Sequence, residues 1–61
     1  MHFEFYKNIL VISNYRQIKQ LTNDLIEVEG LSVYGSLLKV IRLDKDKIAI
    51  KGEVNKIILG E

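Results

Sequence analysis

The chain has 61 residues, enough for one small domain that buries only about 60% of the surface its unfolded form exposes. It has no cysteine and a single histidine, His2, which excludes disulfides, thiolate zinc sites, iron–sulfur clusters and histidine-rich metal sites. Nine basic and eight acidic residues give a net charge of +1, too close to neutral for a nonspecific nucleic-acid binder.

The N-terminal third contains short strand patterns. Four apolar residues have odd numbers, the spacing of one face of a strand: Phe3, Phe5, Ile9 and Val11. Asn8 is the expected kink or turn between the two pairs. The longest apolar run, residues 9–12, is far shorter than a membrane span. No basic region followed by an apolar stretch marks a secretory signal. We therefore expect a cytoplasmic protein. Because disulfide and metal stabilisation are absent, we also expect this small domain to form a homo-oligomer.

Residues 14–22 leave two structures open. Helical spacing relates Tyr15, Ile18, Leu21 and Leu25, and Ser13 or Asn14 is available as an N-cap. The alternative is a strand in which Ile18 shares a face with Ile26 and Val28, after a turn at residues 22–24. The pattern alone does not decide between a short helix and a strand.

The clearest signal is a repeated unit of apolar, any, apolar, any, Gly. It occurs at residues 26–30, 31–35 and 48–52, and it ends at Gly30, Gly35 and Gly52. Each unit has the period of a strand with one buried face, closed by a residue that tolerates positive φ. The repeats predict an all-β fold, a small antiparallel β-meander of five to six strands, with these glycines as turn residues.

Two predicted hairpin turns set the register. A two-residue turn at Glu29-Gly30 places Ile26 opposite Val33, and a second turn at Gly35-Ser36 places Val33 opposite Leu38. Both turns direct the same residues to one face, which are Ile26, Val28, Leu31, Val33, Leu38 and Val40. A slip of one residue at either turn would remove this agreement.

The opposite face of these strands carries an apolar cluster beside the predicted Gly35 turn. Its members are Leu25, Tyr34 and Leu37. Either a neighbouring segment covers them, or they form an interaction patch, since contiguous exposed apolar surface marks interfaces.

The C-terminal third begins with a charged connection. Residues 44–46 resemble the start of a calcium loop, but the other ligands of that loop are missing, so a solvated turn is favoured. After it, the alternation of residues 53–59 breaks between Val54 and Ile57. This break predicts a bulge or bend, with Gly52 as the residue that enables it.

No constellation of catalytic residues is evident, so we predict that the chain is not an enzyme and binds no cofactor or metal. Glu27 and Glu29 alternate with buried positions and are expected in solvent, and His2 at the terminus is a poor base for a serine nucleophile. RNA binding is the alternative, because residues 39–56 contain six basic and three acidic residues. Their charges alternate in sign, which is typical of a solvated surface.

In their order along the chain, several of these segments together resemble the YabP/YqfC family of sporulation proteins. The segments that carry the resemblance are residues 12–18, 25–28, 31–40 and 43–54. The resemblance implies one domain over residues 1–61, acting in the mother cell during endospore formation through other sporulation or membrane-associated proteins. It provides no catalytic residues, and it favours a strand over residues 14–21. The compact Glu29-Gly30 junction departs from the slightly longer turn expected of the family.

Overall fold

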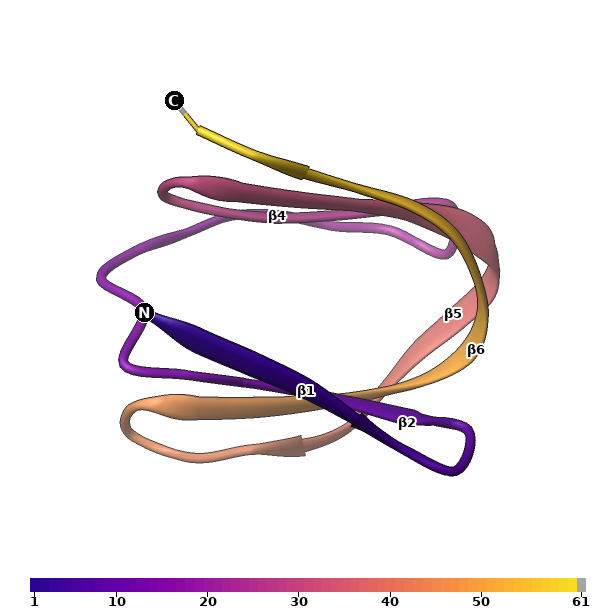
Figure 1. The fold of residues 1–61 in the computed structure, drawn as a ribbon, viewed down its shortest axis with the longest axis horizontal. Helices are drawn as coiled ribbons and strands as arrows, with labels where there is room; N and C mark the ends of the chain where they lie inside the picture. Colours follow the sequence, from indigo (N-terminus) through magenta and orange to yellow (C-terminus); the bar gives the residue numbers. More distant parts are fainter. Residues whose placement is uncertain (61) are drawn as a thin grey trace.

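A computed structural model describes residues 1–60, which form one antiparallel sheet of six strands (Figure 1). The strands are β1 (His2–Tyr6), β2 (Ile9–Ser13), β3 (Ile18–Leu21), β4 (Leu25–Val28), β5 (Leu31–Leu43) and β6 (Lys47–Leu59). Their order in the sheet is β1-β2-β6-β5-β4-β3. The predicted all-β fold is confirmed. The alternative of a short helix near residues 14–22 is wrong, because this segment contains β3 and no helix. Within residues 1–60, no helix has the length and apolarity to cross a membrane.

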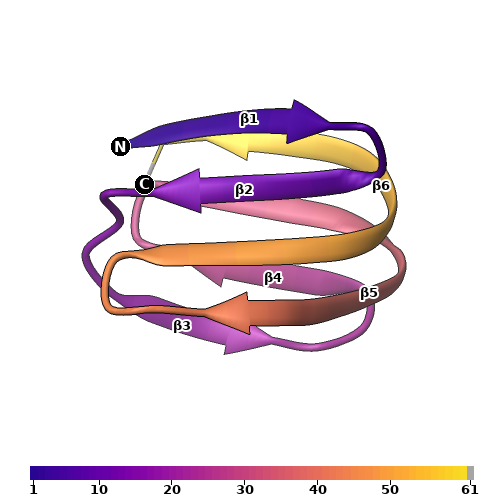
Figure 2. The same ribbon diagram turned by 90° about the horizontal axis from the view of Figure 1, so that it is seen from below.

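The two longest strands bend and roll the sheet into two layers (Figures 1 and 2). In one layer, β2 pairs with the first part of β6, residues 47–51, and β1 forms its edge. In the other layer, β4 pairs with the first part of β5, residues 31–34, and β3 forms its edge. Because β5 and β6 run through both layers side by side, they connect the two halves of the sheet.

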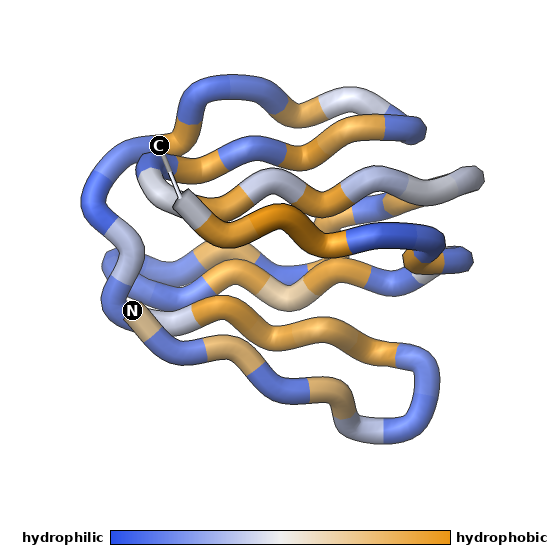
Figure 3. Tube along the Cα trace, turned by 45° about the horizontal axis from the view of Figure 1, so that its top comes forward, coloured by the Kyte–Doolittle hydropathy of each residue, from blue (hydrophilic) through white to orange (hydrophobic). Residues whose placement is uncertain are grey.

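The core lies between the layers. Hydropathy alternates along β1 and the first part of β5, whereas residues 9–12 of β2 are apolar throughout (Figure 3). The buried members of the core are Leu10, Ile12, Ile26, Val28, Leu31, Val33, Leu38, Ile48 and Ile50. The predicted buried face is confirmed for five of its six residues, and Val40 packs against the core while partly buried.

In the β1–β2 hairpin, the residues that face the core are odd-numbered in β1 and even-numbered in β2. Phe3 packs against the core, but Leu10 and Ile12 are the buried residues of β2, while Ile9 and Val11 face outwards. The two-residue turn at Lys7-Asn8, with Lys7 at φ 59°, places odd residues of β1 opposite even residues of β2. The turn predicted at Asn8 is confirmed.

The second predicted hairpin turn is wrong. The Glu29-Gly30 turn exists and Ile26 is opposite Val33, but β5 continues through Gly35, and Val33 lies opposite Ile57. Between the pairs Ser36–Glu53 and Lys39–Lys51, β5 has two residues, Leu37 and Leu38, where β6 has one. This β-bulge moves the inward-facing positions from odd to even. A bulge and a two-residue turn therefore produce the same hydrophobic pattern.

Gly52 is also not a turn residue, because it lies inside β6 at φ 143°. The predicted irregularity in residues 53–59 is confirmed: Tyr34 pairs with Lys56 and Gly35 with Val54, which leaves Asn55 as an extra residue. The charged connection is a turn between β5 and β6, in which the Asp44 amide donates to the Lys47 carbonyl at 2.8 Å.

Candidate interaction surfaces

The predicted patch is brought together at one corner of the sheet. Leu25 and Tyr34 are directly opposed on β4 and β5, facing away from the core. Leu25 is half-buried, Tyr34 is 37% exposed and Leu37 is 81% exposed. No described segment covers these residues fully, so we name Leu25, Tyr34 and Leu37 the corner patch.

Two backbone hydrogen bonds hold Leu37 beside the start of β4. The amide of Gly35 donates to the Asp24 carbonyl at 3.1 Å, and the amide of Leu38 donates to the Asn23 carbonyl at 2.8 Å. Leu37 lies between these two donors in the β5 bulge, while the side chain of Leu38 enters the core. The bulge thus directs neighbouring leucines to opposite sides of the sheet.

Leu37 is unusual in both its backbone and its side chain. Its φ of 55° lies in the left-handed region, which costs a residue other than glycine about 1–2 kcal/mol. Its side chain is the most exposed of the large hydrophobic residues in the described part of the chain. Glycine or asparagine would suit this backbone better and would expose less apolar surface. Stability of the isolated domain therefore does not explain the choice of leucine.

Charges of both signs lie beside the corner patch. Lys56 lies opposite Tyr34, with its Nζ 5.2 Å from the centre of the tyrosine ring. Glu27 follows Leu25 on the same outward face of β4. The patch is therefore apolar, and charges of both signs lie beside it.

A second apolar surface lies on the outside of the other layer, and sequence reasoning missed it. A hollow of about 460 Å³ is lined by residues of β2, β5 and β6 and by the turn at Asp44. Ala49 lies between Val11 and Arg42 in adjacent strands. Because its side chain is only a methyl group, it forms the floor of the hollow between two longer side chains. Ile9 and Ile41 add further apolar lining. We name this feature the Ala49 hollow.

The only sequence signal for the Ala49 hollow is that residues 9–12 are all apolar, at odd and even positions alike. Such a run indicates a strand that contacts apolar surface on both sides. The pairing of β2 with β6 joins segments that are far apart in the chain, and no local turn predicts it. Sequence reasoning therefore could not place Val11 beside Ala49.

Basic residues gather near this hollow. Lys39 and Lys51 are directly opposed on β5 and β6, and Lys47 lines the hollow itself. Arg42 donates to Asp44 at 2.9 Å, whereas none of the three lysines forms an ion pair with another residue of the described chain. The positive charge beside the hollow is therefore only partly compensated.

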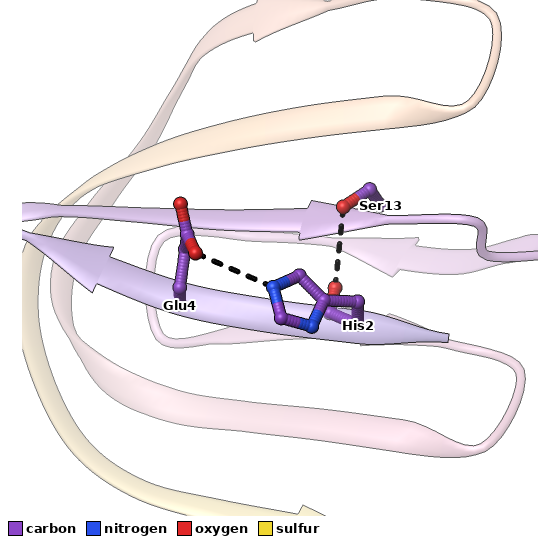
Figure 4. Close-up of polar contacts among 3 residues, drawn as sticks. All are labelled: His2, Glu4 and Ser13. Atoms are coloured by element: carbon purple, nitrogen blue, oxygen red, sulfur yellow. Dashed lines mark hydrogen bonds and ion pairs between the residues drawn. The ribbon is translucent and has the colours of Figure 1, made fainter.

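His2, Glu4 and Ser13 meet on the outer face of the β1–β2 hairpin (Figure 4). The imidazole Nε2 of His2 lies 3.3 Å from Glu4 Oε1, while the Ser13 hydroxyl donates to the backbone carbonyl of His2 at 3.5 Å. The hydroxyl is therefore bonded to the main chain and not to the ring that would have to activate it. Among residues 1–60, no three His, Cys, Asp or Glu side chains are grouped to hold a metal ion.

Comparison of the chain with protein-family models, with curated proteins and with solved structures gives no match. The corner patch and the Ala49 hollow are therefore interpreted from their own geometry.

Proposed function

We propose that this chain is a protein-interaction domain without catalytic activity, and that it self-associates through the corner patch. Leu37 carries the proposal. Its φ of 55° lowers the stability of the single chain, and its side chain, 81% exposed, adds apolar surface that a partner could bury. Strained residues of this kind concentrate at functional sites. Burial of this side chain against a partner would offset the cost of the backbone conformation.

A second copy of the chain is the partner that fits the corner patch. The border of the patch contains the cation of Lys56 and the anion of Glu27, so two copies related by a two-fold axis can place opposite charges together. The core of a 61-residue chain is small, and association of two such chains adds buried apolar surface.

The cellular setting that we propose is endospore formation in the mother cell of a sporulating bacterium. The resemblance of residues 12–54 to the YabP/YqfC family supports it. In this setting, the cytoplasmic domain would bind other sporulation or membrane-associated proteins. Deletion of its gene should lower the yield of heat-resistant spores, and the wild-type gene should restore it. An unchanged spore yield would contradict this setting.

Leu37→Asn tests self-association, because it should separate stability from binding. Asparagine tolerates positive φ, so the variant should be more stable than the wild type by about 1 kcal/mol, yet it should remain monomeric. Sedimentation at several concentrations measures the mass, and urea denaturation measures the free energy of unfolding. Leu59→Asn is the matched control: Leu59 is 64% exposed at ordinary strand φ, and its variant should associate like the wild type. A wild-type chain that is monomeric at every concentration would overturn the proposal.

RNA binding is the second candidate function. Lys39, Lys47 and Lys51 share one outer surface, which favours contact with phosphates. Titration with a random RNA pool at low and high salt tests it, and an absence of binding at low salt would exclude it.

A further inference from the structure

The Ala49 hollow has the size and composition of a binding site. Its volume of about 460 Å³ lies within the range of about 300–1,000 Å³ that is typical of ligand pockets. Val11 is opposed to Ala49 on one side and Arg42 on the other, so the methyl group of Ala49 is flanked by two longer side chains. The hollow is therefore a feature of three paired strands.

The charges beside the hollow indicate the chemistry of its partner. Two carboxylates at this surface already have partners, since Glu4 contacts His2 and Asp44 pairs with Arg42. By contrast, no described carboxylate forms an ion pair with Lys47, Lys51 or Lys39. Like charges directly opposed in a sheet, as Lys39 and Lys51 are, lower its stability. A bound anion would compensate for this repulsion.

We propose that the Ala49 hollow binds a segment of another protein in which an apolar residue is flanked by Asp or Glu. The apolar side chain fills the space above Ala49, and the carboxylates pair with Lys47 and Lys51. This inference rests on the proposed function as an interaction domain and assigns it a second surface, in the layer opposite the corner patch.

Two other occupants fit the hollow less well. A second copy of the chain would bring its own lysines against Lys39, Lys47 and Lys51, and this repulsion opposes self-association here. Single-stranded RNA would supply phosphates, but its bases stack on aromatic rings, and the lining of the hollow contains no aromatic residue. An acidic and apolar segment satisfies both the lining and the charges.

The test uses the full chain and a phage library of random 12-residue peptides. Peptides enriched on the wild type should contain an apolar residue next to Asp or Glu. The dissociation constant of an enriched synthetic peptide is then measured by fluorescence anisotropy. Ala49→Leu fills the hollow and should weaken binding at least tenfold, as should Lys47→Glu. The effect of Lys47→Glu should diminish at high salt, because that contact is ionic.

A matched pair of variants, one at the hollow and one on the other layer, controls for nonspecific effects. Ile41 lines the hollow and Ile58 lies on the outer face of the other layer, and both are 45% exposed. Ile41→Lys should weaken peptide binding at least tenfold, whereas Ile58→Lys should change it less than twofold. Thermal unfolding of each variant shows that it is folded.

Three results would overturn the inference: no enriched peptides, enriched peptides without acidic residues, or binding that Ala49→Leu leaves unchanged. Binding of random RNA that requires the lysines but is insensitive to Ala49→Leu would replace it with nucleic-acid recognition. Self-association is tested separately by sedimentation of the Leu37→Asn variant. A chain that associates but binds no peptide therefore overturns this inference alone, and a monomeric chain that binds peptide overturns only the self-association.

Discussion

Gly52 lies directly against the main chain of Leu37: a Cβ atom on Gly52 would be 2.5 Å from the Leu37 carbonyl oxygen. The contact occurs where β5 and β6 cross from one layer to the other. Gly52→Ala adds this clash to the strain of φ 143°. We predict that it lowers the free energy of unfolding by about 2–4 kcal/mol, measured by urea denaturation.

Gly60→Ala separates these two contributions. Gly60 also has positive φ, at 126°, but a Cβ there would meet nothing within 4 Å. This variant should lose only about 1 kcal/mol. Equal losses for both variants would show that the Leu37 contact contributes nothing.

Reversal of one charge in the pair Lys39–Lys51 should stabilise the sheet. Lys51→Glu places an opposite charge across from Lys39, and we predict a gain of about 0.5–1 kcal/mol at low salt. The gain should fall in 1 M salt, where the Debye length is about 3 Å. Lys19→Glu, on the edge strand β3, is the control and should change stability by less than about 0.5 kcal/mol. A gain that persists in high salt would contradict the electrostatic cause.

Leu10 should be among the residues on which the fold depends most strongly. It is fully buried and lies opposite Ile50, joining the β1–β2 hairpin to β6. Leu10→Ala should cost about 2–5 kcal/mol. A chain of this length has only about 3–9 kcal/mol of stability, so circular dichroism should show a large loss of structure. Leu59→Ala, at a 64% exposed position, should leave the spectrum unchanged.

The turn before β4 depends on the hydroxyl group of Thr22. This group accepts a hydrogen bond from the Leu25 amide at 3.0 Å, and its own proton can reach the Asp24 carboxylate or the Leu25 carbonyl, each at 2.9 Å. Thr22→Ala should cost about 1 kcal/mol in thermal or urea unfolding. Thr22→Ser keeps the hydroxyl and should retain most of that stability. If serine and alanine cost the same, the hydroxyl is not the cause.

Local patterns predicted the parts of the fold that depend on neighbouring residues. The compact Glu29-Gly30 turn leaves only one register that buries Ile26 with Val33, and that register is observed. Val54 and Ile57 differ in parity yet both pack against the core, so the bulge at Asn55 was visible as a break in alternation. In each case the signal lies within a few residues.

Two features were beyond the reach of local patterns. A turn at Gly35 and a bulge at Leu37 produce the same change of parity, so the sequence cannot distinguish a short hairpin from a long bent strand. The predicted turn and the observed bulge therefore both leave Leu37 outside the core. The Ala49 hollow depends on the pairing of β2 with β6, which sequence spacing does not reveal.

The position of β6 between β2 and β5 also has a consequence for the order of folding. Among the described strands, the β1–β2 hairpin is paired with the rest of the sheet only through β6, so it gains no partner strand until β6 is in place. The pairing of β2 with β6 closes a loop that contains β3, β4 and β5, and such closure is slow compared with formation of a hairpin. Refolding should therefore show an early phase in β3–β5 and a later phase at Leu10 and Ile12. Until that docking, the buried sides of Ile48 and Ile50 would be open to aggregation.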